Sequence, residues 1–126
     1  IVLAKNLKNH LEKGSGSIVN VTSIAGGRVH DFAGSAYATS KAALSALTRE
    51  MAADFGPSGI RVNSIAPGEI KTEIISPKSE EIILPNIPLG RFGTPEEVAQ
   101  TIYFLCSDMS QYLNGSEIHV NGGQHV

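Results

Sequence analysis

The sequence predicts an α/β fold in which a parallel sheet is covered by helices on both faces. Segments of helical periodicity alternate along the chain with short runs of β-branched residues, and glycine or proline turns separate them. This alternation is typical of parallel sheets, because parallel strands need long crossover connections. The chain has 126 residues, of which 41% are hydrophobic and 17% charged, with 13 glycines. These values suit one globular domain rich in small residues.

A helix and a strand are expected in the first part of the chain. Residues 1–13 are predicted to end a helix, because Leu3, Leu7 and Leu11 share one face and the glycines that follow stop the pattern. Residues 17–22 are predicted to form a buried parallel strand, since they are few and rich in β-branched side chains. Ser23 then stands at the carboxyl end of this strand, where open α/β sheets bind ligands.

After a glycine-containing loop at 24–34, residues 35–55 are predicted to form the long helix of the chain. Ser35 is the expected N-cap, and Gly56-Pro57 is a stop signal. The many alanines permit close approach of another helix, so this helix is also a candidate subunit interface. One stripe is expected to face the core and a second to lie beside it: Ala36, Ala43, Leu47 and Met51, then Tyr37, Lys41, Leu44 and Thr48.

The next segments are a second strand and a long irregular stretch. Residues 60–66 are predicted to form the strand, which Pro67-Gly68 ends. Residues 69–93 show little periodicity and carry several prolines. Long irregular stretches in compact domains are usually functional, so residues 69–93 are interpreted as a lid or binding loop.

A third helix and a last strand complete the expected order. Thr94, Pro95 and Glu97 form a helix start, with a cap, a proline at the first position and a glutamate three residues after the cap. Residues 117–120 are predicted to form the final short strand. The buried face of the helix is expected to contain Val98, Ile102, Leu105 and Cys106.

Composition and charge exclude several classes of function. The net charge of −2 gives no support for binding to nucleic acid or to an anionic membrane. A single cysteine, Cys106, cannot form an internal disulfide and fits a reducing compartment. No apolar run approaches the roughly 20 residues of a membrane span, and no signal peptide is recognisable. The four histidines have no metal-ligand spacing. We therefore expect a cytoplasmic protein without a metal site.

The residues Tyr37 and Lys41 suggest acid–base chemistry. Positions i and i+4 of a helix lie on the same face, so the spacing places an ammonium group beside a phenol. A nearby positive charge favours the ionised form of an acid. A phenol influenced in this way can exchange a proton with a substrate. Ser23, at the end of the first predicted strand, can then hold the reacting oxygen.

With these elements placed, the chain resembles the C-terminal half of the classical short-chain dehydrogenase/reductase family. Five segments match the family in order and spacing, and together they cover most of the chain. The similarity is greatest to the 3-oxoacyl-carrier-protein reductase and sugar dehydrogenase branches. The matching segments are IVNVTSIAG (18–26), YATSKAAL (37–44), GIRVNSIAPGEIKT (59–72), PLGRFGTPEEVA (88–99) and NGSEIHVNGG (114–123).

This resemblance implies a Rossmann-type doubly wound parallel sheet and an oxidoreductase that transfers a hydride between NAD(P)(H) and a ketone or secondary alcohol. Tyr37 is the implied general acid/base, and Ser23 polarises the substrate oxygen, with Thr22 as the alternative assignment. Lys41 is expected to stabilise the ionised phenol and to hydrogen-bond the nicotinamide ribose. The implied cofactor-binding residues are Tyr37, Lys41, Pro67, Gly68, Ile70 and Thr72. The expected substrate is a small carbonyl compound or alcohol, and the expected assembly is a homodimer or homotetramer.

One part of the family pattern is not found in these residues. A dinucleotide site needs a glycine-rich turn between a first strand and a helix, and Gly14-Ser15-Gly16 precedes a strand instead. The residue that selects NAD or NADP is not identifiable either, so that choice stays open. We interpret residues 1–126 as the C-terminal part of one NAD(P)-binding domain whose glycine-rich half lies elsewhere. The alternative interpretation is a non-catalytic fragment or assembly module.

Overall fold

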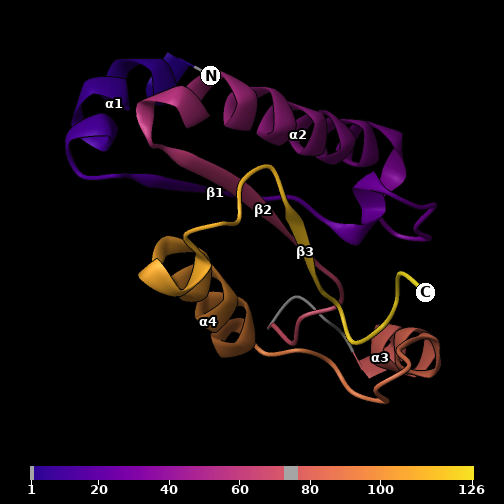
Figure 1. Cartoon of the computed structure of the whole chain (residues 1–126). Helices are drawn as coiled ribbons and strands as arrows, with labels where there is room; N and C mark the ends of the chain where they lie inside the picture. The colour runs from indigo at the N-terminus through magenta and orange to yellow at the C-terminus, as the bar shows by residue number, and fades with distance from the viewer. Residues whose placement is uncertain (1, 73–76) are drawn as a thin grey trace.

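A computed structural model of the chain describes residues 2–72 and 77–126 and confirms the predicted α/β class (Figure 1). Helices and parallel strands alternate along the chain, and short 3₁₀ turns connect several of them. Residues 1 and 73–76, which fall within the predicted first helix and the predicted loop, lie outside the described part. The main elements are α1 (Val2–Lys13), β1 (Ser17–Val21), α2 (Gly34–Phe55), β2 (Arg61–Pro67), α3 (Pro77–Ile83), α4 (Pro95–Cys106) and β3 (Glu117–Val120).

The three described strands form one parallel sheet in the order β1-β2-β3. The register pairs Ile18 with Val62 and Ile65 with Ile118. The middle strand β2 is buried from Val62 to Ala66, because it has a neighbour on each side and helices on both faces. In the described chain β1 pairs with β2 alone, and its last residue, Val21, is 42% exposed. The prediction of a parallel strand at 17–22 is confirmed, but its full burial is wrong because β1 forms an edge.

Helices α1 and α2 cover one face of the sheet (Figure 1), and the main core lies beneath them. Met51 and Phe55 of α2 pack there with Ile60 and Val62, and Leu11 of α1 packs against the cluster. The predicted core stripe of α2 is wrong in its first half, since Ala36 and Ala43 are exposed. Only the second half of α2 lies over this core, so the buried residues of the helix are Thr48, Met51, Ala52 and Phe55.

The two ends of α2 differ in how well they were predicted. The end is confirmed, because α2 stops at Phe55 and a 3₁₀ turn, Gly56–Ser58, follows. The N-cap prediction is wrong: the helix starts at Gly34, and Ala33 is the cap residue, without a side-chain hydrogen bond. Gly34 has a φ of +68°, a left-handed value that glycine adopts easily, so the chain turns into the helix there without Ser35 as the cap.

The stretch 69–93 contains more structure than its sequence suggested. A short helix, α3, and a 3₁₀ turn, Leu84–Asn86, lie within it, so the prediction of an irregular loop is wrong for those residues. Ile83 packs with Ile87 and Phe92 in a small separate apolar cluster. These residues are too few and too unevenly spaced to give a periodic pattern, although they are enough to hold the segment together.

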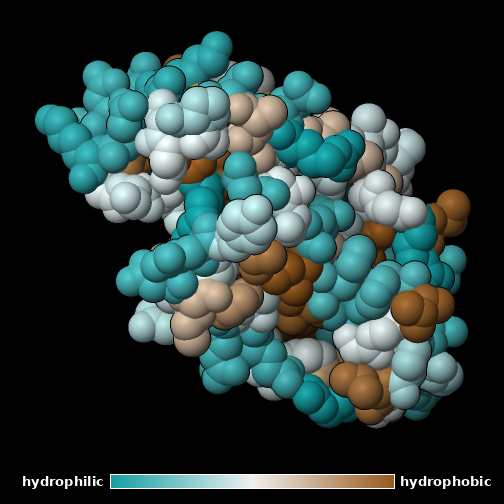
Figure 2. Space-filling view, viewed as in Figure 1, coloured by the Kyte–Doolittle hydropathy of each residue, from teal (hydrophilic) through white to brown (hydrophobic). Residues whose placement is uncertain are grey.

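Helix α4 covers the other face of the sheet, and in Figure 2 hydrophobic atoms gather between α4 and β3 on a largely hydrophilic face. Its predicted start is confirmed: Glu97 N–H donates to Thr94 Oγ1, and Thr94 N–H donates to the Glu97 carboxylate. Leu105 is fully buried, but the core position predicted for Cys106 is wrong. Cys106 is exposed because the next residue along a helix points about 100° away from Leu105. Within the described ranges, no helix has both the length and the apolar character to cross a bilayer.

Candidate active site

The carboxyl end of β1 places Ser23 beside the start of α2. After Val21 the chain enters a 3₁₀ turn, Ile24–Gly26, and Ser23 is its N-cap, with its hydroxyl accepting a hydrogen bond from Ala25 N–H at 3.2 Å. Ser23 and Tyr37 line the same cavity of about 430 Å³. The structure therefore brings together a hydroxyl and a phenol that lie on different elements.

Gly26 explains why this turn can sit so close to α2. A Cβ atom at position 26 would lie 2.9 Å from Ala42 N and 2.9 Å from Lys41 C, both of them backbone atoms of the helix. Backbone cannot move aside like the end of a flexible side chain, so any larger residue would push the turn and the helix apart. The absence of a side chain at Gly26 thus sets the separation between Ser23 and the residues of α2.

Tyr37 and Lys41 lie one turn apart on α2, as their spacing predicted. The Lys41 ammonium nitrogen is 5.5 Å from the centroid of the Tyr37 ring. Tyr37 is 46% exposed, which leaves its ring accessible from the cavity. Lys41 Nζ also donates to the carbonyl of Val21 at 2.8 Å. Because Thr22 N–H donates to Ile65 of β2, the adjacent Val21 carbonyl faces the free edge of the sheet. Lys41 therefore links the face of α2 that carries Tyr37 to the edge of β1.

Thr22, the alternative to Ser23, has a different environment. Its side chain is only 2% exposed, and its hydroxyl lies 2.8 Å from the Ile65 carbonyl and 2.7 Å from the Glu117 carboxylate. Thr22 does not line the cavity that contains Tyr37. Of the two hydroxyl residues at this strand end, the geometry favours Ser23 as the group available to a ligand.

The predicted cofactor residues after β2 follow one another along an extended segment. Pro67 ends β2, and Gly68 lines the cavity with Ser23 and Tyr37. Ile70 forms a parallel bridge with Gly93, in which Gly93 N–H donates to the Glu69 carbonyl and Lys71 N–H donates to the Gly93 carbonyl. The N–H and C=O of Ile70 itself therefore point away from Gly93. Thr72 is exposed at the end of the described segment. Of these four residues, only Gly68 shares the cavity wall with the catalytic candidates.

The structure also shows functional candidates that sequence reasoning missed. His30 and Glu69 line the cavity of Ser23 and Tyr37, and their side chains form a contact of 2.9 Å. His30 lies in a loop outside the matched family segments, and Glu69 occupies a position of segment 59–72 to which the resemblance assigns no role, so no sequence signal linked them. Phe32 and Ile83 add apolar surface to the same wall.

Glu117 of β3 connects α2 to β2 and to Thr22, the residue that follows β1. Its Oε2 atom accepts from Ser45 of α2 at 2.7 Å, from Thr22 at 2.7 Å and from Ser64 at 3.1 Å. Partial burial raises the pKa of Glu117, but the three hydroxyl hydrogen bonds and nearby His119 outweigh it, so the pKa lies below its usual value. The carboxylate is therefore charged near neutral pH and holds α2 in register with the sheet.

Comparison with known proteins identifies the family. A family model described as Enoyl-(Acyl carrier protein) reductase matches residues 1–125. Protein FixR of Bradyrhizobium diazoefficiens is 63% identical over 126 residues, which are all of this chain and 45% of that protein. An oxidoreductase (short chain dehydrogenase/reductase) from Brucella ovis is 61% identical, with a TM-score of 0.72 over 95% of this chain and 49% of its own.

A third match extends the comparison to a structure with a cofactor. A 3-oxoacyl-[acyl-carrier protein] reductase with bound NAD from Brucella melitensis has a TM-score of 0.91 and 33% identity, over 98% of this chain and 47% of its own. The chain belongs to the short-chain dehydrogenase/reductase family, and the predicted Rossmann-type parallel sheet is confirmed. The chain spans about half the length of the relatives it matches.

The close contact at Gly26 predicts a sharp difference between two neighbouring glycines. Gly26→Ala should lower the free energy of unfolding of the full-length protein by about 1–3 kcal/mol, because the new methyl group meets fixed backbone. Gly27→Ala is the matched control, since its Cβ would meet nothing closer than 3.8 Å. Urea denaturation measures both. Equal effects of the two substitutions would contradict the proposed role of Gly26.

The lowered pKa of Glu117 predicts a pH-dependent contribution to stability. The stabilisation is complete above the unfolded pKa of about 4.3 and is lost as the pH falls through the lower folded value. Glu117→Gln should therefore lower the unfolding free energy by about 1 kcal/mol at pH 7, and the difference should shrink as the pH approaches 3. Glu50→Gln, on an exposed part of α2, is the control. A difference that is constant over this pH range would exclude the carboxylate charge as its cause.

Proposed function

We propose that the protein containing this chain is an NAD(P)-dependent oxidoreductase that interconverts a ketone and a secondary alcohol. The observation that carries this proposal is the cavity shared by Ser23 and Tyr37, with the Lys41 ammonium 5.5 Å from the Tyr37 ring. The family and its 3-oxoacyl-[acyl-carrier protein] reductase relative support the same reaction class. The protein thus acts on small carbonyl or alcohol compounds.

In the proposed mechanism, the side chains move one proton and orient one oxygen. Tyr37 donates a proton to the substrate oxygen during reduction and accepts it during oxidation. Ser23 hydrogen-bonds the same oxygen and polarises the carbon–oxygen bond. The Lys41 ammonium stabilises negative charge on the phenol oxygen, because the two groups lie one helical turn apart.

The residues near the cavity also fit a nicotinamide cofactor, although NAD and NADP are not distinguished. Gly68 lines the cavity wall, and the backbone N–H and C=O of Ile70, which face away from Gly93, suit recognition of a carboxamide. Lys41 uses one of its three N–H donors on Val21, so two stay for the ribose hydroxyls. Pro67 and Thr72 border the same segment, and the bound cofactor supplies or accepts the hydride.

We further infer that residues 1–126 are the C-terminal part of one NAD(P)-binding Rossmann domain, with the glycine-rich part on a segment outside this chain. The relatives are about twice as long as the chain, and one of them binds NAD. The free edge of β1 supports the inference, because an unpaired strand edge invites a further strand. Such a strand would also cover Val21.

A non-catalytic fragment or assembly module is the second candidate, favoured by exposed apolar residues on α1 and α2. Leu3 and Leu7 of α1 and Ala36 and Ala43 of α2 are exposed. Their exposure also supports a homo-oligomer, a dimer or tetramer, whose subunits pack through these helices.

The intact mass and cofactor binding of the purified protein distinguish the two candidates. We expect about twice the 13.3 kDa of this chain and a change in NAD(P)H fluorescence on mixing. A mass of 13.3 kDa without a fluorescence change would support the module and contradict the enzyme.

Replacement of Tyr37 tests the chemistry directly. Tyr37→Phe removes one hydroxyl from an exposed ring and should reduce kcat by about 100-fold or more, with the melting temperature unchanged. The control is Tyr103→Phe on the exposed side of α4, which should keep the wild-type rate. Substrate-dependent NAD(P)H absorbance measures both. Wild-type turnover in the Tyr37 variant would rule out the proposed proton transfer.

A further inference from the structure

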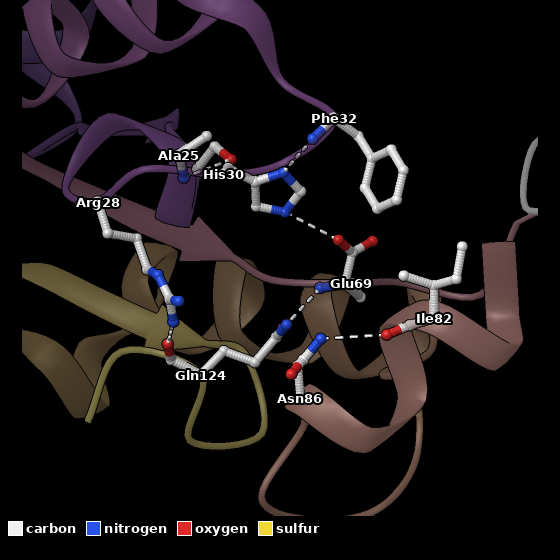
Figure 3. Close-up of polar contacts among 9 residues, drawn as sticks. Ala25, Arg28, His30, Phe32, Glu69, Ile82, Asn86 and Gln124 are labelled. Carbon is white, nitrogen blue, oxygen red and sulfur yellow. Dashed lines mark hydrogen bonds and ion pairs between the residues drawn. The ribbon is translucent and has the colours of Figure 1, made fainter.

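The hydrogen-bonded pair of His30 and Glu69 lies where the catalytic cavity meets a smaller one. Both residues line the cavity that contains Ser23 and Tyr37, and both line a neighbouring cavity of about 140 Å³. Their side chains are 19% and 16% exposed, so they are largely withdrawn from bulk water. In Figure 3 the Glu69 carboxylate points toward the His30 ring, between the segment before α2 and the segment after β2.

The contacts around this pair fix the direction of the carboxylate. Phe32 N–H donates to His30 Nδ1 at 3.3 Å, so the ring proton is on Nε2 and is donated to Glu69 Oε1 at 2.9 Å. The backbone N–H of Glu69 donates to Gln124 Oε1 at 3.0 Å. Glu69 is thus held at its backbone and at one carboxylate oxygen (Figure 3).

The second carboxylate oxygen, Oε2, is available to a ligand. Among the described residues it has no hydrogen-bond partner. Oε2 is also not fully buried. In the described part of the chain, the fully buried side-chain polar atom that lacks a hydrogen-bond partner is Asn121 Nδ2, not Glu69 Oε2. An anchored carboxylate with one open oxygen in a cavity wall is a preorganised acceptor for a charged hydrogen-bond donor.

The negative charge of Glu69 stands out among the residues that line the catalytic cavity. The other described walls of this cavity are mainly apolar, with Ile24, Phe32 and Ile83 among them. Of the described lining residues, Glu69 is the one with an acidic side chain, and none is a lysine or arginine. A carboxylate beside apolar surface attracts a cation more strongly than the same group in water does, and it repels an anion.

From this arrangement we propose that Glu69 is a specificity-determining residue that binds a positively charged group of the substrate. The substrate class is a secondary alcohol or ketone with an ammonium group on the same molecule. This inference rests on the proposed oxidoreductase function. During oxidation the alcohol carbon transfers a hydride to NAD(P)⁺ and its hydroxyl proton goes to Tyr37, while the ammonium keeps its protons and donates one hydrogen bond to Glu69.

A charge series of substrates tests the proposal in the full-length protein with its cofactor. The probes are alkan-2-ols that end in an ammonium, a methyl or a carboxylate group, with one to four methylenes between the ends. NAD(P)H absorbance gives kcat/KM for each. We expect the ammonium members to be favoured over methyl members of equal length. We also expect Glu69→Gln, which keeps the acceptor for His30, to reduce this preference roughly tenfold or more.

Asp31→Asn is the matched control, because Asp31 lines only the smaller cavity and loses the same charge. It should keep the wild-type ratio of ammonium to methyl substrates. A wild-type preference for methyl or carboxylate members, or an unchanged ratio in Glu69→Gln, would overturn the specificity proposal alone. The wild-type series needs no variant, so the proposal stays testable even if Glu69→Gln fails to fold. No turnover of any alcohol would instead overturn the proposed function, and this inference with it.

Discussion

The contact between the turn at Gly26 and the backbone of α2 determines the geometry of the whole site. Ser23 belongs to the sheet side of this contact, and Tyr37 and Lys41 belong to the helix side. Because a Cβ at Gly26 would lie 2.9 Å from two backbone atoms of α2, the two sides pack too closely for a residue with a side chain at this position. Glu117 strengthens the same contact from below through hydrogen bonds to both helix and strands. The close backbone contact at Gly26 and the hydrogen bonds of Glu117 thus hold α2 against the sheet at the site.

Lys41 connects this packing to chemistry. Its ammonium group lies near the Tyr37 ring and donates a hydrogen bond to the Val21 carbonyl at the edge of β1. One side chain therefore supports the helix–sheet contact and places a positive charge near the phenol. A lysine suits both tasks because its three donors can be divided among different acceptors. The stability of the helix–sheet contact and the proposed proton transfer are therefore not independent, and a substitution at Lys41 would alter both.

The sequence allowed the elements and the catalytic candidates to be predicted, but not their burial. The parallel sheet follows from the alternation of helices and strands, and the capping box at Thr94 follows from a local motif; the structure has both. Whether Ala36 or Val21 is covered depends on the surfaces that pack against them, which no local pattern contains. Cys106 was misplaced because a helix face predicted from spacing can be wrong by one residue at the helix end.

His30 and Glu69 escaped prediction for a different reason, which also explains how one family can serve many substrates. The proposed proton transfer uses residues at a strand end and on a long helix, where regular structure leaves a recognisable spacing. The pair proposed to distinguish substrates lies on connecting segments, 39 residues apart, and meets only in the folded chain. Connections tolerate sequence change while a rigid scaffold holds their ends. Family membership therefore defines the reaction class, whereas the charge of the cavity wall, and with it the substrate, is set by contacts that only the structure shows.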